Sequence, residues 1–130
     1  MKLTNNFVLK EFKCKDGTEV PLSLMDNVQL LADNLQVLRD CLEAPIHINS
    51  AYRYSEYNSS VGGTSKSQHL LCKAADIRVD SYNPVQVYDT IEMLIKDGSM
   101  KDGGIGLYDT FTHYDVRDKS ARWDFRTDKT

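Results

Sequence analysis

The sequence has few cysteines, no long apolar run and little excess charge. Its three cysteines, Cys14, Cys41 and Cys72, are too few and too unevenly spaced for a disulfide framework, so we expect reduced thiols. No apolar stretch approaches the roughly 20 residues that cross a bilayer. Residues 1–14 carry charges where a signal peptide has its hydrophobic centre. The sequence therefore predicts a chain made in the cytoplasm, with neither a membrane span nor an export signal.

The charge balance argues against a polyanionic partner. The chain has 16 Lys and Arg against 19 Asp and Glu, a net charge of −3, which gives no general attraction to phosphate. We therefore expect no nucleic-acid partner. A length of 130 residues, with 41% hydrophobic and 27% charged residues, is typical of one globular domain. Residues 1–130 are predicted to form a single domain with one hydrophobic core and one functional site. The sequence does not indicate an oligomeric state.

Hydrophobic periodicity predicts the first half of the fold. Apolar residues from Leu24 to Leu42 recur at steps of three and four, which is typical of an amphipathic helix. The segment Pro45–Ala51 alternates apolar and polar residues, as a half-buried strand does, and places His47 away from the apolar face. Residues 52–67 are rich in Ser, Gly, Asn and Tyr, which predicts a loop with one short helical turn.

The second half predicts a strand, a helix and a hairpin. Lys73–Val79 has the pattern of a strand, and Asn83 followed by proline is a helix start. Residues 105–108 and 111–116 are predicted to form two strands of a short hairpin that turns at Asp109 and Thr110. The order of elements predicts an α+β domain with helices packed on a small, largely antiparallel sheet.

Two of the three histidines lie near aspartates in a pattern that suits a metal. His69 is followed by Asp76 seven residues later, and His113 lies on the predicted hairpin. Two imidazoles and a carboxylate suit Zn²⁺, whose catalytic sites take three protein ligands. This spacing requires His69 at a loop end and Asp76 in the next strand. Ordinary hydrogen bonds and caps remain the alternative interpretation of such residues.

A set of short motifs spread along the chain resembles the M15 family of zinc peptidases. The resemblance is closest to small members related to the zinc D-Ala-D-Ala carboxypeptidases, and it covers nearly the whole chain. Its most specific elements are Ser67-x-His69-x6-Asp76 and His113-x-Asp115. The other motifs are Ser50-Ala-Tyr-Arg53, Tyr57-Asn58, Val61-Gly62-Gly63, Ala74-Ala75-Asp76, Gly104-Ile-Gly106-Leu-Tyr108, His113-Tyr-Asp115-Val-Arg117 and Arg122-Trp123.

The resemblance implies an M15 or hedgehog-like peptidase fold with Zn²⁺ held by His69, Asp76 and His113. It implies hydrolysis of D-amino-acid peptides from bacterial peptidoglycan or its precursors, by a carboxypeptidase or a stem-peptide endopeptidase. Arg53 would stabilise the tetrahedral oxyanion or bind a substrate carboxylate, and Ser67 would hydrogen-bond near the site. The lack of a signal peptide fits a phage-type or prophage enzyme that another protein releases to the cell wall, or a cytoplasmic enzyme acting on precursors.

The general base departs from the family pattern. Relatives commonly carry an acid three positions before the final histidine, or a histidine two before it, where this chain has Thr110 and Phe111. Asp109, at the predicted turn, and Asp115, on the same strand face as His113, are the candidate catalytic carboxylates. An equal alternative interprets Asp109 as a turn residue, and Asp115 is alternatively a group that orients His113. The departure also motivates an alternative function, a non-catalytic zinc-stabilised binding module of the same fold.

Four further residues receive structural interpretations. Cys72 lies where relatives often have glycine, and we interpret it as a small buried residue rather than a fourth zinc ligand. His47 is interpreted as a solvated or substrate-rim histidine. Arg117 and Trp123 resemble family positions that we interpret as structural, a cation and a ring that hold the hairpin to the C-terminal segment, with a role in catalysis as the alternative.

Overall fold

The computed structural model describes residues 1–127. Its helices are α1 (Met25–Leu42), α2 (Ser55–Ser60) and α3 (Pro84–Lys96), and its strands are β1 (Ile46–Ser50), β2 (Ala74–Val79), β3 (Gly104–Leu107), β4 (Thr112–Asp115) and β5 (Ala121–Asp124). Three short 3₁₀ turns complete the set: η1 (Leu9–Phe12), η2 (Leu22–Leu24) and η3 (Gln68–Leu71). Among the described residues, no helix has the length and apolar character needed to cross a bilayer.

The five strands form one mixed sheet in the order β1-β2-β4-β3-β5. The β1–β2, β2–β4 and β3–β4 pairs are antiparallel, and only β3–β5 is parallel. The predicted α+β class, with helices on a largely antiparallel sheet, is confirmed. The predicted hairpin of β3 and β4 is also present.

Strand β5 was not predicted, because polar contacts hold it rather than an apolar alternation. All four of its residues are only half-buried. The guanidinium of Arg122 donates hydrogen bonds to Glu92 of α3, to Asp102 and to the carbonyl oxygen of Gly103. These contacts tie the strand to α3 and to the segment before β3.

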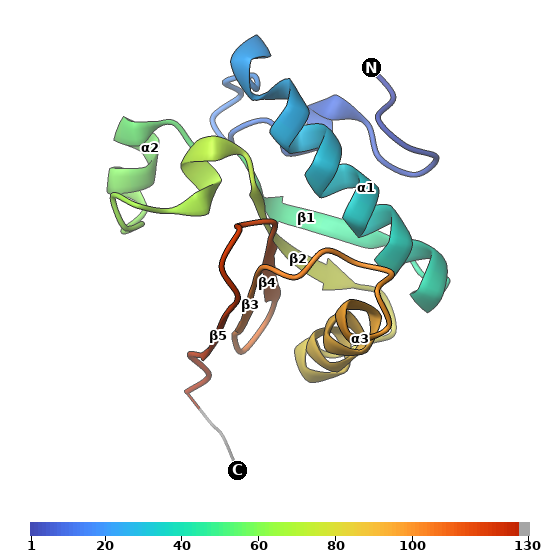
Figure 1. Cartoon of the computed structure of the whole chain (residues 1–130). Coiled ribbons are helices and arrows are strands. Elements are labelled where there is room, and N and C mark those ends of the chain that lie inside the picture. The colour runs from blue at the N-terminus through green and yellow to red at the C-terminus, as the bar shows by residue number, and fades with distance from the viewer. Residues whose placement is uncertain (128–130) are drawn as a thin grey trace.

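The two faces of the sheet have different roles. On one face, Ile77, Ile105 and Tyr114 are fully buried in the core, and the Thr112 hydroxyl donates to the carbonyl oxygen of Pro84 at the start of α3. In Figure 1, α3 lies on one side of β3, β4 and β5, and α2 lies on the other. Alternate residues of the same strands point to the α2 side, because side chains alternate along a strand.

Local signals explain the helix bounds. Asn83 caps α3: its side chain accepts a hydrogen bond from the Gln86 amide, and the Gln86 side chain accepts one from the Asn83 amide, each at 2.8 Å. Helix α1 ends at Leu42, because Glu43 takes a left-handed conformation (φ 50°) and Pro45 follows. The helix proper begins at Met25, and the residues before it form η2.

Candidate metal centre and peptide pocket

His69 is positioned by the short turn η3. The Ser67 hydroxyl caps this turn and accepts a hydrogen bond from the His69 amide at 3.2 Å. The Nδ1 atom of His69 lies 2.6 Å from the carbonyl oxygen of Ala51, so Nδ1 carries the proton and donates it there. The other ring nitrogen, Nε2, faces Asp76, whose Oδ2 lies 3.4 Å away.

Asp76 and His113 are brought together by strand pairing. They are register partners in the β2–β4 ladder, and His113 Nδ1 lies 2.9 Å from Asp76 Oδ1. One ligand atom from each of His69, Asp76 and His113 can be chosen so that all three lie within 4.8 Å of one another. The three side chains are buried. The structure thus brings together the three residues that the sequence predicted as metal ligands.

The donor set and its supporting contacts fit Zn²⁺. Two imidazole nitrogens and one carboxylate oxygen converge, which is a ligand type that zinc accepts. Each histidine has its second ring nitrogen fixed by an acceptor: the Ala51 carbonyl for His69 and the Asp115 carboxylate for His113, at 2.6 and 2.7 Å. Such outer contacts set which nitrogen faces a metal. The geometry therefore supports a metal held by Nε2 of His69 and Nδ1 of His113.

The charges of the cluster follow from competition between burial and hydrogen bonding. Burial disfavours ionisation of Asp76, but hydrogen bonds from His113 and His69 outweigh it, so the pKa of Asp76 lies well below its usual value. Burial likewise opposes a charged His113, but its bonds to Asp115 and Asp76 raise the pKa of its imidazole. The site favours an ionised carboxylate between two imidazoles.

Asp115 stands behind His113 and is shut off from solvent. It is fully buried and accepts five hydrogen bonds: one from His113 Nε2, one from the Gly104 amide and three from Arg117. These bonds and the charge of His113 lower the pKa of Asp115 against the opposing effect of burial. Of the two roles considered for Asp115, this geometry is that of a group that orients His113.

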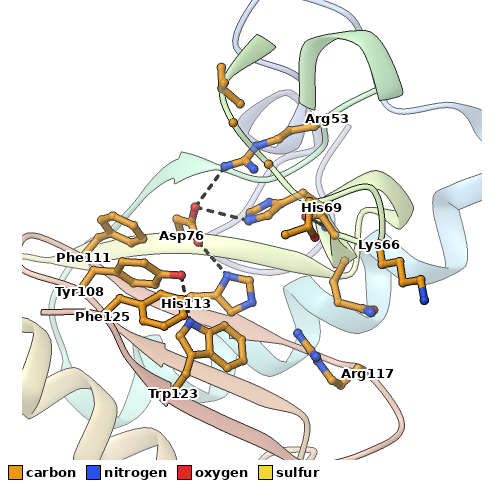
Figure 2. Close-up of a pocket in the computed structure, with 16 residues that line it drawn as sticks. Arg53, Lys66, His69, Asp76, Tyr108, Phe111, His113, Arg117, Trp123 and Phe125 are labelled. Atoms are coloured by element: carbon orange, nitrogen blue, oxygen red, sulfur yellow. Dashed lines mark hydrogen bonds and ion pairs between the residues drawn. The ribbon is translucent and has the colours of Figure 1, made fainter. Parts of the chain in front are cut away.

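A pocket of about 610 Å³ opens over the cluster. Figure 2 shows Arg53 approaching Asp76 from one side, with the rings of Tyr108 and Trp123 on the other side. The Arg53 guanidinium lies 3.5 Å from Asp76 Oδ2, and Ser50 and Asn58 also accept hydrogen bonds from it. The lining residues are Arg53, Val61, Gly62, Gly63, Thr64, Lys66, Ser67, Gln68, His69, Asp76, Tyr108, Phe111, His113, Arg117, Trp123 and Phe125.

Asp109 does not line this pocket. It is exposed on the turn between β3 and β4, and its carboxylate accepts hydrogen bonds from the amide and the hydroxyl of Thr127, at 3.0 and 2.8 Å. Its neighbours Tyr108 and Phe111 do line the pocket. The structure thus groups Arg53 and Ser67 with the three metal-ligand candidates and leaves Asp109 outside that group.

The aromatic wall of the pocket was missed by the sequence analysis. It consists of Tyr108, Phe111, Trp123 and Phe125, which come from the ends of β3 and β4 and from β5. The predicted contact between Arg117 and Trp123 is confirmed, with the guanidinium carbon 5.2 Å from the ring centroid. Both residues also line the pocket.

Two glycines in β3 make room for this wall, and they are a sequence signal for it. A Cβ atom at Gly104 would overlap the Asp115 carboxylate, and one at Gly106 would overlap the Trp123 indole. Because residues two apart on a strand share a face, the Gly104-Ile-Gly106 motif predicts a stripe without side chains on one face of β3. Asp115 and Trp123 lie against that stripe.

Cys72 and His47 lie where the structural interpretations placed them, outside the metal group. Cys72 is fully buried, burial raises the pKa of its thiol to about 12, and it takes a left-handed conformation (φ 53°) at the end of η3. Glycine adopts that conformation more readily than other residues. His47 is half-buried and lies 2.9 Å from Asp80, which belongs to the segment after β2.

A buried group of two imidazoles and a carboxylate, open to a pocket on an α+β sheet, defines a candidate metal-dependent hydrolase. A family model described as Peptidase M15 matches residues 4–115, so the chain belongs to the M15 peptidase family. The match includes the three candidate ligands, and β5 lies beyond it. M15 peptidases are metallopeptidases, which agrees with the His-Asp-His group. No curated protein sequence matches the chain.

Proposed function

We propose that this M15 peptidase is a zinc enzyme that hydrolyses D-amino-acid peptides of bacterial peptidoglycan. The reaction is either removal of a terminal D-Ala or cleavage inside a stem peptide. The observation that carries the proposal is the buried group of His69, Asp76 and His113 at the floor of an open pocket. The family membership supports the class of reaction, and the position of the group in the pocket supports this location for it.

Each residue of the group has a defined task in this proposal. Zn²⁺ would be held by His69, Asp76 and His113, and when bound it polarises a carbonyl and lowers the pKa of water. Arg53 binds a substrate carboxylate or the charge that develops on the carbonyl oxygen. Ser67 holds the start of η3 through the His69 amide and also lines the pocket, where it contacts the peptide.

The charge of the pocket supports an anionic peptide as substrate. Three cations line it, Arg53, Lys66 and Arg117, and among the lining residues that the structure describes only Asp76 carries a carboxylate. Arg117 is engaged by Asp115, and Arg53 lies near Asp76. Lys66 has no ion-pair partner within residues 1–127, so it is available to a carboxylate of the peptide. Stem peptides of peptidoglycan, or their precursors, carry such carboxylates.

The two predicted carboxylates differ in their suitability as general base. Asp115 is fully buried and both of its oxygens accept hydrogen bonds, so it is not open to a water molecule. Asp109 is exposed and lies on the turn between two pocket-lining residues, Tyr108 and Phe111, and within residues 1–127 its carboxylate is bonded only to Thr127. We therefore propose Asp109 as the base, released from Thr127 when substrate binds. An Asp109→Asn variant is then expected to lose about 100-fold in kcat, the usual scale for such a group.

Mass spectrometry of peptidoglycan fragments tests the proposal. The zinc-loaded protein is incubated with purified muropeptides, beside a chelated sample and a His113→Ala variant. We expect cleavage that disappears in both, and the mass lost identifies the bond. His47→Ala, a histidine outside the pocket, is the matched control and should cleave normally. If the protein takes up one zinc ion per chain but cleaves no muropeptide, the peptidase proposal fails and a zinc-stabilised binding module replaces it.

A further inference from the structure

Tyr108 is held rigidly at the edge of the candidate metal centre. Its ring stacks on Phe111, with centroids 4.3 Å apart and planes 13° apart, and Phe125 packs edge-on at 5.8 Å. Phe111 directly precedes β4, and Phe125 directly follows β5. Three segments of the chain therefore hold the Tyr108 ring in one position. Little further conformational entropy of this side chain is lost when a substrate binds.

The Tyr108 hydroxyl is anchored on the side of the pocket that carries His113. Its oxygen lies 2.9 Å from the indole nitrogen of Trp123, whose ring centroid is 5.0 Å from that of His113. Figure 2 shows the hydroxyl turned toward His113 and Asp76. Because Gly106 has no side chain, the indole lies close against β3 and its nitrogen reaches this oxygen.

The direction of the hydroxyl proton follows from the chemistry of indole. An indole N–H donates and never accepts, so the Tyr108 oxygen is the acceptor of this bond and its own hydrogen points elsewhere. Among residues 1–127 no group accepts that hydrogen, while Tyr108 lines the pocket. Burial raises the pKa of Tyr108 above its usual value, so the hydroxyl stays protonated at neutral pH.

We propose that Tyr108 is a further catalytic residue, whose hydroxyl donates a hydrogen bond to the oxygen of the scissile carbonyl as negative charge develops there. The inference rests on the proposed peptidase function. No proton is transferred by Tyr108: the O–H bond stays intact, and the hydrogen bond strengthens as the carbonyl carbon becomes tetrahedral. Arg53 approaches Asp76 from the opposite side of the site. In this proposal Arg53 therefore binds a carboxylate of the peptide.

A Tyr108→Phe variant tests this assignment, because it keeps the stacked ring and removes only the hydroxyl. With the muropeptide that the wild type cleaves, we expect kcat to fall roughly 100-fold or more, the scale for loss of one such donor. KM and zinc content should stay within about twofold, because losing an interaction made only in the transition state lowers kcat and kcat/KM equally. Tyr82→Phe is the matched control, since the Tyr82 hydroxyl donates to the Leu42 carbonyl, far from the pocket lining.

Binding measurements give a second readout that does not depend on turnover. A peptide phosphinate has a tetrahedral phosphorus with negatively charged oxygens in place of the cleaved bond. It therefore mimics the tetrahedral carbon and the charged oxygen of the transition state. Calorimetry should show its affinity for Tyr108→Phe lowered by about the same factor as kcat/KM, while affinity for the product peptide is unchanged. Trp123 is the single tryptophan of the chain, so its emission should also shift in Tyr108→Phe when the indole N–H loses its acceptor.

The outcomes separate this inference from the function on which it rests. A wild type that cleaves no muropeptide overturns the proposed function and the role of Tyr108 with it. A wild type that cleaves, beside a Tyr108→Phe variant with unchanged kcat, overturns the role of Tyr108 alone. Equal weakening of phosphinate and product binding also overturns it, because the hydroxyl would then act in ordinary peptide binding.

Discussion

At the scale of single residues, Asp115 explains how His113, on a β-strand, is oriented as a candidate metal ligand. Its carboxylate fixes His113 from behind, and Arg117 in turn fixes the carboxylate. An Asp115→Asn variant keeps the size of the side chain and removes its charge. We expect its zinc affinity to fall 10- to 100-fold, the usual effect of losing such a supporting group.

Competition with a chromophoric chelator measures this change in affinity. Asp118→Asn is a suitable control, because that carboxylate is 93% exposed and lies 4.0 Å from Lys101, outside the pocket lining. Unaltered zinc affinity in Asp115→Asn would mean that strand pairing alone orients His113.

The protonation of His113 predicts a pH dependence of metal binding. Its pKa is raised in the metal-free protein, because the bonds to Asp115 and Asp76 outweigh burial. Zinc must displace the proton on Nδ1, so its affinity should fall as the pH drops below the pKa of His113. Below the pKa of His113, about one proton should be released from His113 for each zinc ion bound. Well above this pKa, His113 should release none. Calorimetry in buffers of different ionisation enthalpy counts these protons, and equal release at both pH values would contradict the assignment.

At the scale of elements, β3 makes room for the site because two of its residues are glycines. In Gly106→Ala the new methyl group would overlap the Trp123 indole, so we expect a loss of about 1–3 kcal/mol in the free energy of unfolding, typical of overpacking. The same substitution should cost much less in a Trp123→Leu background, where the indole is gone. Denaturant unfolding of the four proteins of this cycle gives the coupling energy. Equal costs in both backgrounds would show that the indole is not the obstacle.

The elements with a strong periodic pattern could be predicted from the sequence. The stripe from Leu24 to Leu42 gave α1, and the Asn83-Pro84 cap gave the start of α3, because both signals are local. The three candidate ligands were also found, since their order and spacing resemble a known family and the strand register then places Asp76 opposite His113.

What escaped prediction depends on contacts between distant segments. Strand β5 has no apolar alternation, and the salt bridges of Arg122 to Glu92 and Asp102 are invisible to a periodicity argument. The aromatic wall forms only because β5 brings Trp123 and Phe125 beside Tyr108. Thr127 holds Asp109 from 18 residues away, which nothing in the turn sequence indicated.

At the scale of the whole molecule, a metal held by His69, Asp76 and His113 would link three separate segments of the chain. His69 lies on η3, Asp76 on β2 and His113 on β4. A ligand that binds only the folded state stabilises it by about 4 kcal/mol at a thousand times its Kd. We therefore expect chelation to lower the midpoint of thermal unfolding, and added zinc to restore it.

Scanning calorimetry with zinc and with chelator measures this shift. His69→Ala should unfold at the same temperature in both conditions, whereas Cys72→Ala should keep the difference, since Cys72 is outside the ligand group. A zinc-dependent shift that survives in His69→Ala would place the metal elsewhere.

The order in which the chain folds follows from where these ligands lie. Asp76 and His113 are 37 residues apart, and α3 and β3 lie between them, so β4 must close a long loop before it can pair with β2. Such distant pairings form late and slowly compared with local turns and helices. Until that pairing is complete, at most two of the three candidate ligands, His69 and Asp76, can be held close together. Tight zinc binding should therefore occur at the slowest step of refolding. The rate of zinc uptake would then report the rate at which the sheet is completed.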